Sequence, residues 1–392
     1  MAQPAFDPGA FQPALRTRLL ILQPTPFCNI DCSYCYLPGR DARSRMTPDT
    51  VRAVARRLLD DGLLGEELSV VWHAGEPLTA PPAFYEDAFG TLQQALGAHT
   101  ALTHCIQTNA TLIDEAWCEL FLRHGVKIGV SIDGPAALHD RHRRTRSGRG
   151  THQRVMQGVA LLRRHGIPFH AIAVVTAATL QAADDFARFF IDLAPTELGL
   201  NFDEAEGANP TSSLAGLEGA HGDFLRALLP TMQAGHLVLR ELAQALQLVA
   251  QPLPTYHWAG QDWPDNAQLL PFALLNVAWN GDFGTFSPEL LGQPSPAHGN
   301  FVLGNVHRQG LFDAARGPAF AHLWQPIREG VARCRDSCAH FAYCGGGSPV
   351  NKLYEAGSLA ATETLYCRTM LKRPFDVALQ SLEQELGTSA PQ

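Results

Sequence analysis

The chain has 392 residues, of which 46% are hydrophobic and 17% charged, enough for one large folded unit and a smaller one. A formal net charge of −8 argues against nucleic acid as a partner, and no apolar run is long enough to span a membrane. Because the first 15 residues also lack a signal-peptide pattern, we expect a cytoplasmic protein. In that compartment nine cysteines indicate metal binding or catalysis and not disulfides.

Strand and helix patterns alternate through the first half of the chain, after a proline-containing arm over residues 1–16 that is expected to be loose. Buried strands are predicted at 19–23, 68–72, 102–107, 127–132, 169–175 and 198–202. Helices are predicted at 47–62 (with Thr47 as N-cap), 82–96, 113–124, 152–165 and 179–193. This alternation indicates an α/β fold with parallel strands and right-handed crossovers. Six units are too few for a closed eightfold barrel, so we expect a partial (β/α)6 barrel over residues 17–235.

The second half of the chain has weaker patterns. Serines and glycines after residue 205 predict a loop or lid, and helical patterns follow at 218–233 and 238–250. A Pro- and Trp-rich connector is expected at 252–264, and Asn280-Gly281 predicts a hairpin within 272–286. We therefore assign a helical linker to 236–270 and a C-terminal domain to 271–392.

Three cysteines follow the first predicted strand at C-x3-C-x2-C spacing, namely Cys28, Cys32 and Cys35. Three thiolates so spaced can hold three irons of a cubane cluster and leave the fourth iron open to a small chelating cofactor. The alternatives are three buried cysteines or a zinc knuckle that lacks one ligand. Cys105 and Cys118 stand alone in apolar surroundings and are expected to be small buried hydrophobic residues.

Polar segments follow the second, third and fourth predicted strands, at residues 73–77, 107–111 and 131–144. Each segment alone is typical of a turn. However, the carboxyl ends of parallel strands share one rim, which is where barrel enzymes carry their chemistry. Together with the cysteine loop, these segments offer a carboxylate for an amino group, an arginine for a carboxylate, and polar groups for a ribose.

A second group of cysteines lies near the C-terminus, with three glycines directly after its third member. Glycines permit the backbone to pass close to a bulky group. The spacing suits either zinc or a fully ligated iron–sulfur cluster and does not decide between them. The four cysteines are Cys334, Cys338, Cys344 and Cys367.

The first cysteine motif, with Tyr34 before its last cysteine, resembles the signature of radical S-adenosylmethionine (SAM) enzymes. The second group resembles the SPASM extension of peptide-modifying members of that superfamily. Within this class the chain most resembles the cyclophane-forming maturases that are encoded beside glycine-rich-repeat precursor peptides. The resemblance extends from about residue 19 to about 373 and rests on residues 22–28, 71–78, 129–135, 344–349 and 362–368.

The resemblance implies a role for each matching residue. Cys28, Cys32 and Cys35 would hold a [4Fe-4S] cluster whose open iron binds the amino and carboxylate groups of SAM. The predicted SAM-binding residues are Tyr34, Gly75, Glu76, Gln107, Asn109, Ser131, Asp133 and Arg143, with Arg144 as a rival to Arg143. Among them, Glu76 matches the glutamate that binds the SAM amino group, whereas Ala74 departs from the usual first glycine of that motif.

The C-terminal extension also departs from its pattern. A full SPASM domain uses seven cysteines for two auxiliary clusters, but residues 276–288 contain none here, and Ser348 stands where the pattern has cysteine. The remaining Cys334, Cys338, Cys344 and Cys367 match a single auxiliary cluster. The resemblance therefore implies SAM and two [4Fe-4S] clusters as cofactors.

By this resemblance, the protein is a maturase that crosslinks an aromatic ring of a ribosomal precursor peptide to the Cβ atom of a nearby residue. Asp282 is the predicted proton acceptor, although an aspartate at this position is also typical of a turn. Implied partners are the peptide and a reductant such as a flavodoxin or ferredoxin. We expect the barrel, the 205–270 segment or the extension to hold the peptide. Alternatives are a thioether or ether crosslink, epimerisation, oxidation of a protein residue, or a zinc-binding module without enzyme activity.

Overall fold

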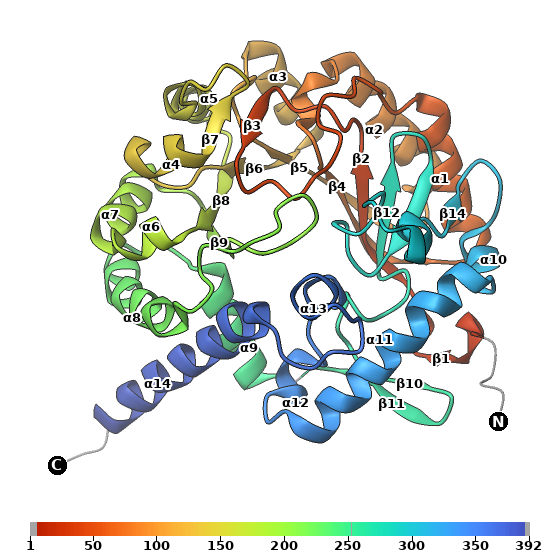
Figure 1. Cartoon of the computed structure of the whole chain (residues 1–392). Coiled ribbons are helices and arrows are strands. Elements are labelled where there is room, and N and C mark those ends of the chain that lie inside the picture. Colours follow the sequence, from red (N-terminus) through yellow and green to blue (C-terminus); the bar gives the residue numbers. More distant parts are fainter. Residues whose placement is uncertain (1–5, 252, 389–392) are drawn as a thin grey trace.

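The computed structural model describes residues 6–251 and 253–388 (Figure 1). Within them, nine strands form one sheet in the order β14-β13-β12-β2-β4-β5-β6-β8-β9. The predicted partial barrel is confirmed, because six of these strands are parallel neighbours that alternate with helices. They are β2 (Thr17–Gln23), β4 (Leu64–Trp72), β5 (Ala101–Thr108), β6 (Lys127–Ser131), β8 (Phe169–Val175) and β9 (Leu198–Phe202).

The helices that cover the barrel begin and end close to the predicted bounds. Thr47 caps the first helix by accepting a hydrogen bond from the Thr50 amide at 3.3 Å, and Pro48 takes the first helical position. The helix predicted at 179–193 is divided in two at residues 181–182. The helices are α1 (Pro48–Asp60), α2 (Pro82–Leu96), α3 (Glu115–His124), α5 (His152–Arg164), α6 (Ala177–Leu180) and α7 (Ala183–Leu193).

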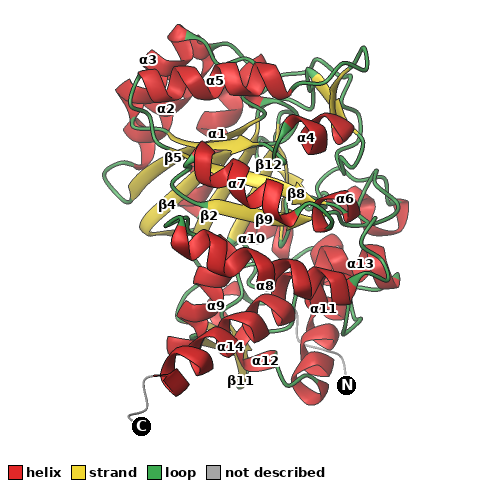
Figure 2. Cartoon of the chain, turned by 90° about the vertical axis from the view of Figure 1, so that its left-hand side faces the viewer, coloured by secondary structure: helices red, strands yellow, loops and turns green. Residues whose placement is uncertain are grey.

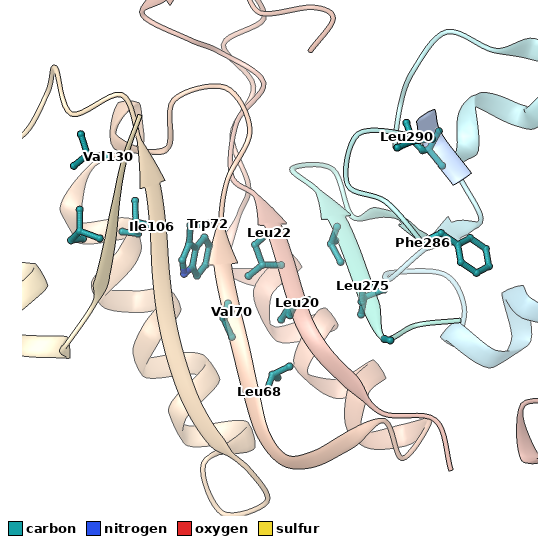
Figure 3. Packing of buried hydrophobic residues seen from close by; sticks show 14 of the residues in the cluster. Leu20, Leu22, Leu68, Val70, Trp72, Ile106, Val130, Leu275, Phe286 and Leu290 are labelled. Atoms are coloured by element: carbon teal, nitrogen blue, oxygen red, sulfur yellow. The ribbon is translucent and has the colours of Figure 1, made fainter. Parts of the chain in front are cut away.

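The strands bury one face against these helices. Leu20 and Leu22 on β2 lie beside Val70 and Trp72 on β4, and all four side chains are buried (Figure 3). The Trp72 ring packs edge-on against Tyr85 of α2, with ring centroids 5.2 Å apart. Because side chains alternate along a strand, the opposite face of the sheet is free to line a cavity.

Two short elements after β6 were not predicted. Helix α4 (Ala136–His142) leads into β7 (Arg143–Thr145), which pairs antiparallel with β3 (Ile30–Cys32) of the cysteine loop. Cys32 lies directly opposite Arg143 in this pair. The β3–β7 pair therefore holds the cysteine loop against the segment that follows β6 and α4.

The predicted hairpin around Asn280-Gly281 is present, and it belongs to the barrel sheet. Its strands are β12 (Leu274–Ala278) and β13 (Asp282–Thr285), and β12 pairs parallel with β2. The short β14 (Gly304–Asn305) completes this edge. The division into domains at residues 236 and 271 stays a prediction.

The remaining helices surround the open side of the barrel. Figure 2 shows α8, α9 and α14 on the side of the strands opposite α2, α3 and α5. No helix in the described ranges is long and apolar enough to cross a bilayer. The remaining elements are η1 (Pro8–Ala10), η2 (Pro77–Thr79), α8 (Glu218–Ala234), α9 (Arg240–Ala250), η3 (Pro296–Phe301), α10 (Leu311–Ala315), α11 (Pro318–Ser337), α12 (Phe341–Cys344), α13 (Pro349–Ala356), the π-helical η4 (Cys367–Lys372) and α14 (Arg373–Thr388).

The N-terminal arm is packed, contrary to the expectation of a loose segment. Phe6 and Phe11 are buried, with the Phe6 ring 4.5 Å from that of Phe320 and the Phe11 ring 5.6 Å from that of Trp258. The expected connector at 252–264 contains β10 (Thr255–Trp258) and β11 (Gln261–Pro264), which form a small sheet with β1 (Phe11–Gln12). Burial of these aromatic rings explains why both segments are ordered. Residues 1–5, 252 and 389–392 lie outside the described part of the chain.

Candidate functional site

A cavity of about 870 Å³ opens at the carboxyl ends of the barrel strands. The cysteine loop and the segments after β4, β5, β6 and β9 contribute to its wall, as do α13 and η4 of the C-terminal region (Figure 1). Cys28, Cys32 and Cys35 all line it. The predicted rim is therefore a single space that is shared by both halves of the chain.

The cysteine loop provides three free thiols at one end of this cavity. Burial raises the pKa of Cys28 and of Cys32 to about 12. Their thiolates are therefore favoured only when a positive group is near, as an iron–sulfur cluster provides. The Arg143 Nη1 atom lies 4.0 Å from Cys32 Sγ. The donor set and its surroundings thus fit a cluster held by three cysteines.

The segment after β4 places a carboxylate beside these thiols. Gly75 has a φ of +58°, and a Cβ atom there would lie 2.5 Å from the carbonyl oxygen of Phe27, so only glycine fits. Glu76 is buried, and its Oε1 accepts hydrogen bonds from the Leu78 amide at 3.0 Å and Thr108 Oγ1 at 2.6 Å. Its Oε2 accepts one from the Asn109 amide at 2.8 Å. Burial nevertheless raises the pKa of Glu76 to about 7.

Arg143 lines the cavity and is held from behind by Asp133. The Arg143 Nε atom donates to Asp133 Oδ2 at 2.9 Å, and both side chains are buried. Asp133 also accepts hydrogen bonds from the Tyr34 hydroxyl and, at 2.9 Å, from the Val174 amide. Asp133 is not among the residues that line the cavity, so its position favours orienting Arg143 and Tyr34. Arg144, the predicted rival, is exposed.

Three further predicted SAM-binding residues, Gln107, Asn109 and Ser131, also lie in the cavity wall. Gln107 Nε2 donates to Ser131 Oγ at 2.8 Å, which joins the ends of β5 and β6. Asn109 Nδ2 donates to Asn29 Oδ1 at 2.9 Å and therefore supports the cysteine loop. The predicted SAM-binding residues thus surround one space, apart from Asp133.

The structure does not bring Asp282 to this cavity. Its carboxylate accepts hydrogen bonds from Asn280 Nδ2 in the turn between β12 and β13 at 2.7 Å, and from Asn305 Nδ2 of the neighbouring β14 at 2.8 Å. These bonds account for Asp282 as a turn residue. Its position gives the predicted role as proton acceptor no support.

Three glutamates that the sequence analysis missed line the cavity instead, namely Glu204, Glu206 and Glu289. Burial raises the pKa of Glu204 to about 8, and the charge of Glu289 adds to this effect. Burial also raises the pKa of Glu206 well above its ordinary value, with the charges of Glu289 and Glu204 adding to it. The short motif Asp203-Glu204-Ala205-Glu206 directly after β9 could have indicated the first two, whereas no local signal marks Glu289.

A second cavity, of about 460 Å³, collects the C-terminal cysteines. Gly346 and Gly347 have φ of +119° and +77°, and a Cβ atom on Gly347 would lie 3.3 Å from Cys367 Sγ, so the backbone passes close to the thiols as expected. Lys352 is buried, and its Nζ atom donates to Cys334 Sγ at 3.4 Å. Across residues 6–251 and 253–388, no three Cys, His, Asp or Glu side chains are close enough to hold a single metal ion. Four thiols around one space fit a larger cluster. The lining cysteines are Cys334, Cys338, Cys344 and Cys367.

Known proteins resemble the chain in sequence. Residues 22–190 match the radical SAM superfamily. The uncharacterized protein sll1766 of Synechocystis sp. is 36% identical over 381 residues, which cover 95% of this chain and 93% of that protein. The serine-type anaerobic sulfatase-maturating enzyme of Bacteroides thetaiotaomicron is 34% identical over 209 residues, so the chain spans only 50% of that relative's length.

Solved structures resemble the chain in fold. Native anSMEcpe with bound AdoMet (SAM) and Cp18Cys peptide matches with a TM-score of 0.74 at 19% identity, over 95% of this chain and 99% of that one. Streptococcus suis SuiB bound to precursor peptide SuiA matches with a TM-score of 0.62 at 17% identity, over 90% of this chain and 76% of that one. At these identities the matches establish the fold.

Proposed function

Because the chain belongs to the radical SAM superfamily and is an enzyme of that class, we propose that it crosslinks a ribosomally made precursor peptide. The crosslink joins an aromatic ring to the Cβ atom of a nearby residue, which makes a cyclophane. The observation that carries this proposal is the single cavity lined by Cys28, Cys32, Cys35 and Glu76 on one side and by the C-terminal region on the other. Its volume, about 870 Å³, leaves room for a peptide segment beside SAM.

Two likenesses support a peptide substrate. Both anSMEcpe and SuiB are described with a bound peptide, and the sulfatase-maturating relative acts on a sulfatase. In this chain, the second cysteine cavity borders the first, because Gly347 lines both. A group bound there would be close to a peptide in the large cavity.

The cofactors follow from the superfamily and from the cysteines. Cys28, Cys32 and Cys35 would hold one [4Fe-4S] cluster, and Cys334, Cys338, Cys344 and Cys367 a second one. With a reductant such as a flavodoxin or ferredoxin, SAM and these clusters supply a 5′-deoxyadenosyl radical and an acceptor for one electron.

The residues of the chain position SAM and exclude water. Glu76 would accept a hydrogen bond from the SAM amino group, and Arg143 would pair with its carboxylate. Asp133 fixes the Arg143 guanidinium through the bond at 2.9 Å. Gln107 and Ser131 would contact the ribose, and the Tyr34 backbone the adenine.

The peptide changes as follows. Its Cβ–H bond breaks and the hydrogen atom leaves as part of 5′-deoxyadenosine. The Cβ radical adds to a ring carbon, and the ring then loses one electron and one proton, which restores aromaticity. The proton passes to a basic group in the cavity.

Co-expression with a peptide encoded beside the gene tests the proposal. Mass spectrometry should show the loss of two hydrogens for each crosslink and fragment ions that place it at an aromatic residue. An unchanged mass with inverted stereochemistry would refute crosslinking and indicate epimerisation.

A further inference from the structure

Three glutamates of the large cavity have no cationic partner. Glu204 and Glu206 follow β9, and Glu289 follows β13, so two segments of the chain that are distant in sequence bring three carboxyl groups to one wall. Across the described residues, no ion pair reaches any of them, and the three arginines of the cavity are paired elsewhere. The arginine pairs are Arg40–Asp31 at 2.9 Å, Arg143–Asp133 at 2.9 Å and Arg240–Glu241 at 2.6 Å.

Two side chains of this cavity also lack hydrogen-bond partners. Glu206 is 8% exposed, and its Oε1 atom has no partner in the described part of the chain. Ser348, on the C-terminal side of the cavity, is 1% exposed, and its Oγ atom has no partner there either. Buried polar atoms are rarely left unpaired, so the missing donor is expected to come from a bound molecule.

We propose that Glu204, Glu206 and Glu289 bind the guanidinium or ammonium group of an arginine or lysine side chain of the substrate peptide. This inference rests on the proposed function. A guanidinium group offers five N–H donors, enough for several carboxylates and for the Ser348 hydroxyl. A neutral amide or an acidic side chain would leave these carboxylates without a counter-charge.

The subsite borders the cysteine loop. The Ala208 amide, two residues after Glu206, donates to the carbonyl oxygen of Tyr36, which directly follows Cys35, at 2.8 Å. A cationic side chain held by the three glutamates is therefore anchored beside this loop.

The test compares two peptides on cluster-loaded, SAM-saturated protein. Both are acetylated and amidated: Gly-Phe-Gly-Arg-Gly, and the same sequence with citrulline, which has the shape of arginine without its charge. We expect the arginine peptide to bind about 10- to 100-fold more tightly, as for hydrogen bonds between charged groups. Glu206→Gln should abolish this preference, and Glu206→Asp should retain it. Glu241→Gln is the matched control, because this buried glutamate of the same cavity already pairs with Arg240.

Equal binding of the two peptides by the wild-type protein, or no binding of the arginine peptide, overturns the subsite. An unchanged preference in Glu206→Gln does so as well. If Glu206→Gln does not fold, the same comparison is made with Glu204→Gln. The subsite is then refuted if the wild-type protein shows no preference for the arginine peptide, or if Glu204→Gln keeps that preference unchanged. If both peptides give equal amounts of a product that lacks two hydrogens, the subsite is refuted and the proposed function stands. Charge-selective binding without such a product refutes crosslinking and leaves the subsite standing.

Discussion

Replacement of Glu76 by glutamine tests the predicted SAM site at a buried carboxylate whose position is fixed by hydrogen bonds. The carboxylate accepts three hydrogen bonds, from the amides of Leu78 and Asn109 at 3.0 and 2.8 Å and from Thr108 Oγ1 at 2.6 Å. A glutamine keeps only one oxygen, so its NH₂ group must face at least one of these donors. One buried N–H left without an acceptor costs about 1–3 kcal/mol of folding free energy.

The effect on SAM binding follows from the lost charge. A hydrogen bond to a charged group contributes about 1.5–3 kcal/mol and one between neutral groups about 0.5–1.5 kcal/mol, so Glu76→Gln should weaken SAM binding about tenfold. Anaerobic equilibrium dialysis of labelled SAM against cluster-loaded protein measures the dissociation constant.

Glu241→Gln is the control for this measurement. Glu241 is also buried and also accepts a backbone hydrogen bond, from the Leu200 amide at 2.9 Å. We expect the control to bind SAM as the wild type does. Equal affinities of Glu76→Gln and the wild type, with the cluster intact, would refute the assignment of Glu76 to the SAM amino group.

Four further predictions follow from single positions. Because burial raises the pKa of Glu76 to about 7, and SAM binding needs its ionised form, affinity should fall about tenfold from pH 8 to pH 6; a flat profile in the wild type would contradict this. Ala74 has a φ of +72°, so Ala74→Gly should raise the free energy of unfolding by about 0.5–1 kcal/mol in denaturant titrations. A decrease in the free energy of unfolding would contradict this and show that the alanine methyl group packs favourably. Asp282→Asn should leave turnover nearly unchanged, whereas a loss of about 100-fold, typical of a general base, would restore Asp282 as proton acceptor. Lys352→Met removes a buried cation from Cys334 and should lower the potential of the second cluster by about 60–130 mV in a redox titration followed by electron paramagnetic resonance; an unchanged potential would mean that no cluster lies beside Lys352.

Sequence patterns predicted the parts of the fold that depend on local signals. Parallel strands inside the fold are continuous apolar runs, as at residues 19–22, and caps such as Thr47 act within one helical turn. The pairing of β1 with β10 joins residues more than 240 positions apart, and the short β7 is too brief to produce a periodic pattern. Such contacts depend on the folded chain, so the packing of the N-terminal arm was not foreseen.

In the candidate site too, some residues have local sequence signals and others come together only in the folded chain. Cysteine spacing and the Gly75-Glu76 segment are local, and the structure places both at one cavity, as expected. Glu206 and Glu289 meet only because the chain returns to the barrel, so neither is conspicuous in the sequence. Asp282 was selected from its place in a predicted hairpin, but a residue in a turn can face either side, and the folded chain places it outside the cavity.

Transfer of a deuterium label tests the central claim most directly. Purified protein with reconstituted clusters is given SAM, a reductant and substrate peptide deuterated at Cβ of the residue to be crosslinked. We predict that 5′-deoxyadenosine gains one deuterium, that one molecule of it forms per crosslink, and that the peptide loses two hydrogens. Deuterium that remains in the peptide, or that is transferred only from a Cα-labelled peptide, would contradict abstraction from Cβ and the crosslinking function with it.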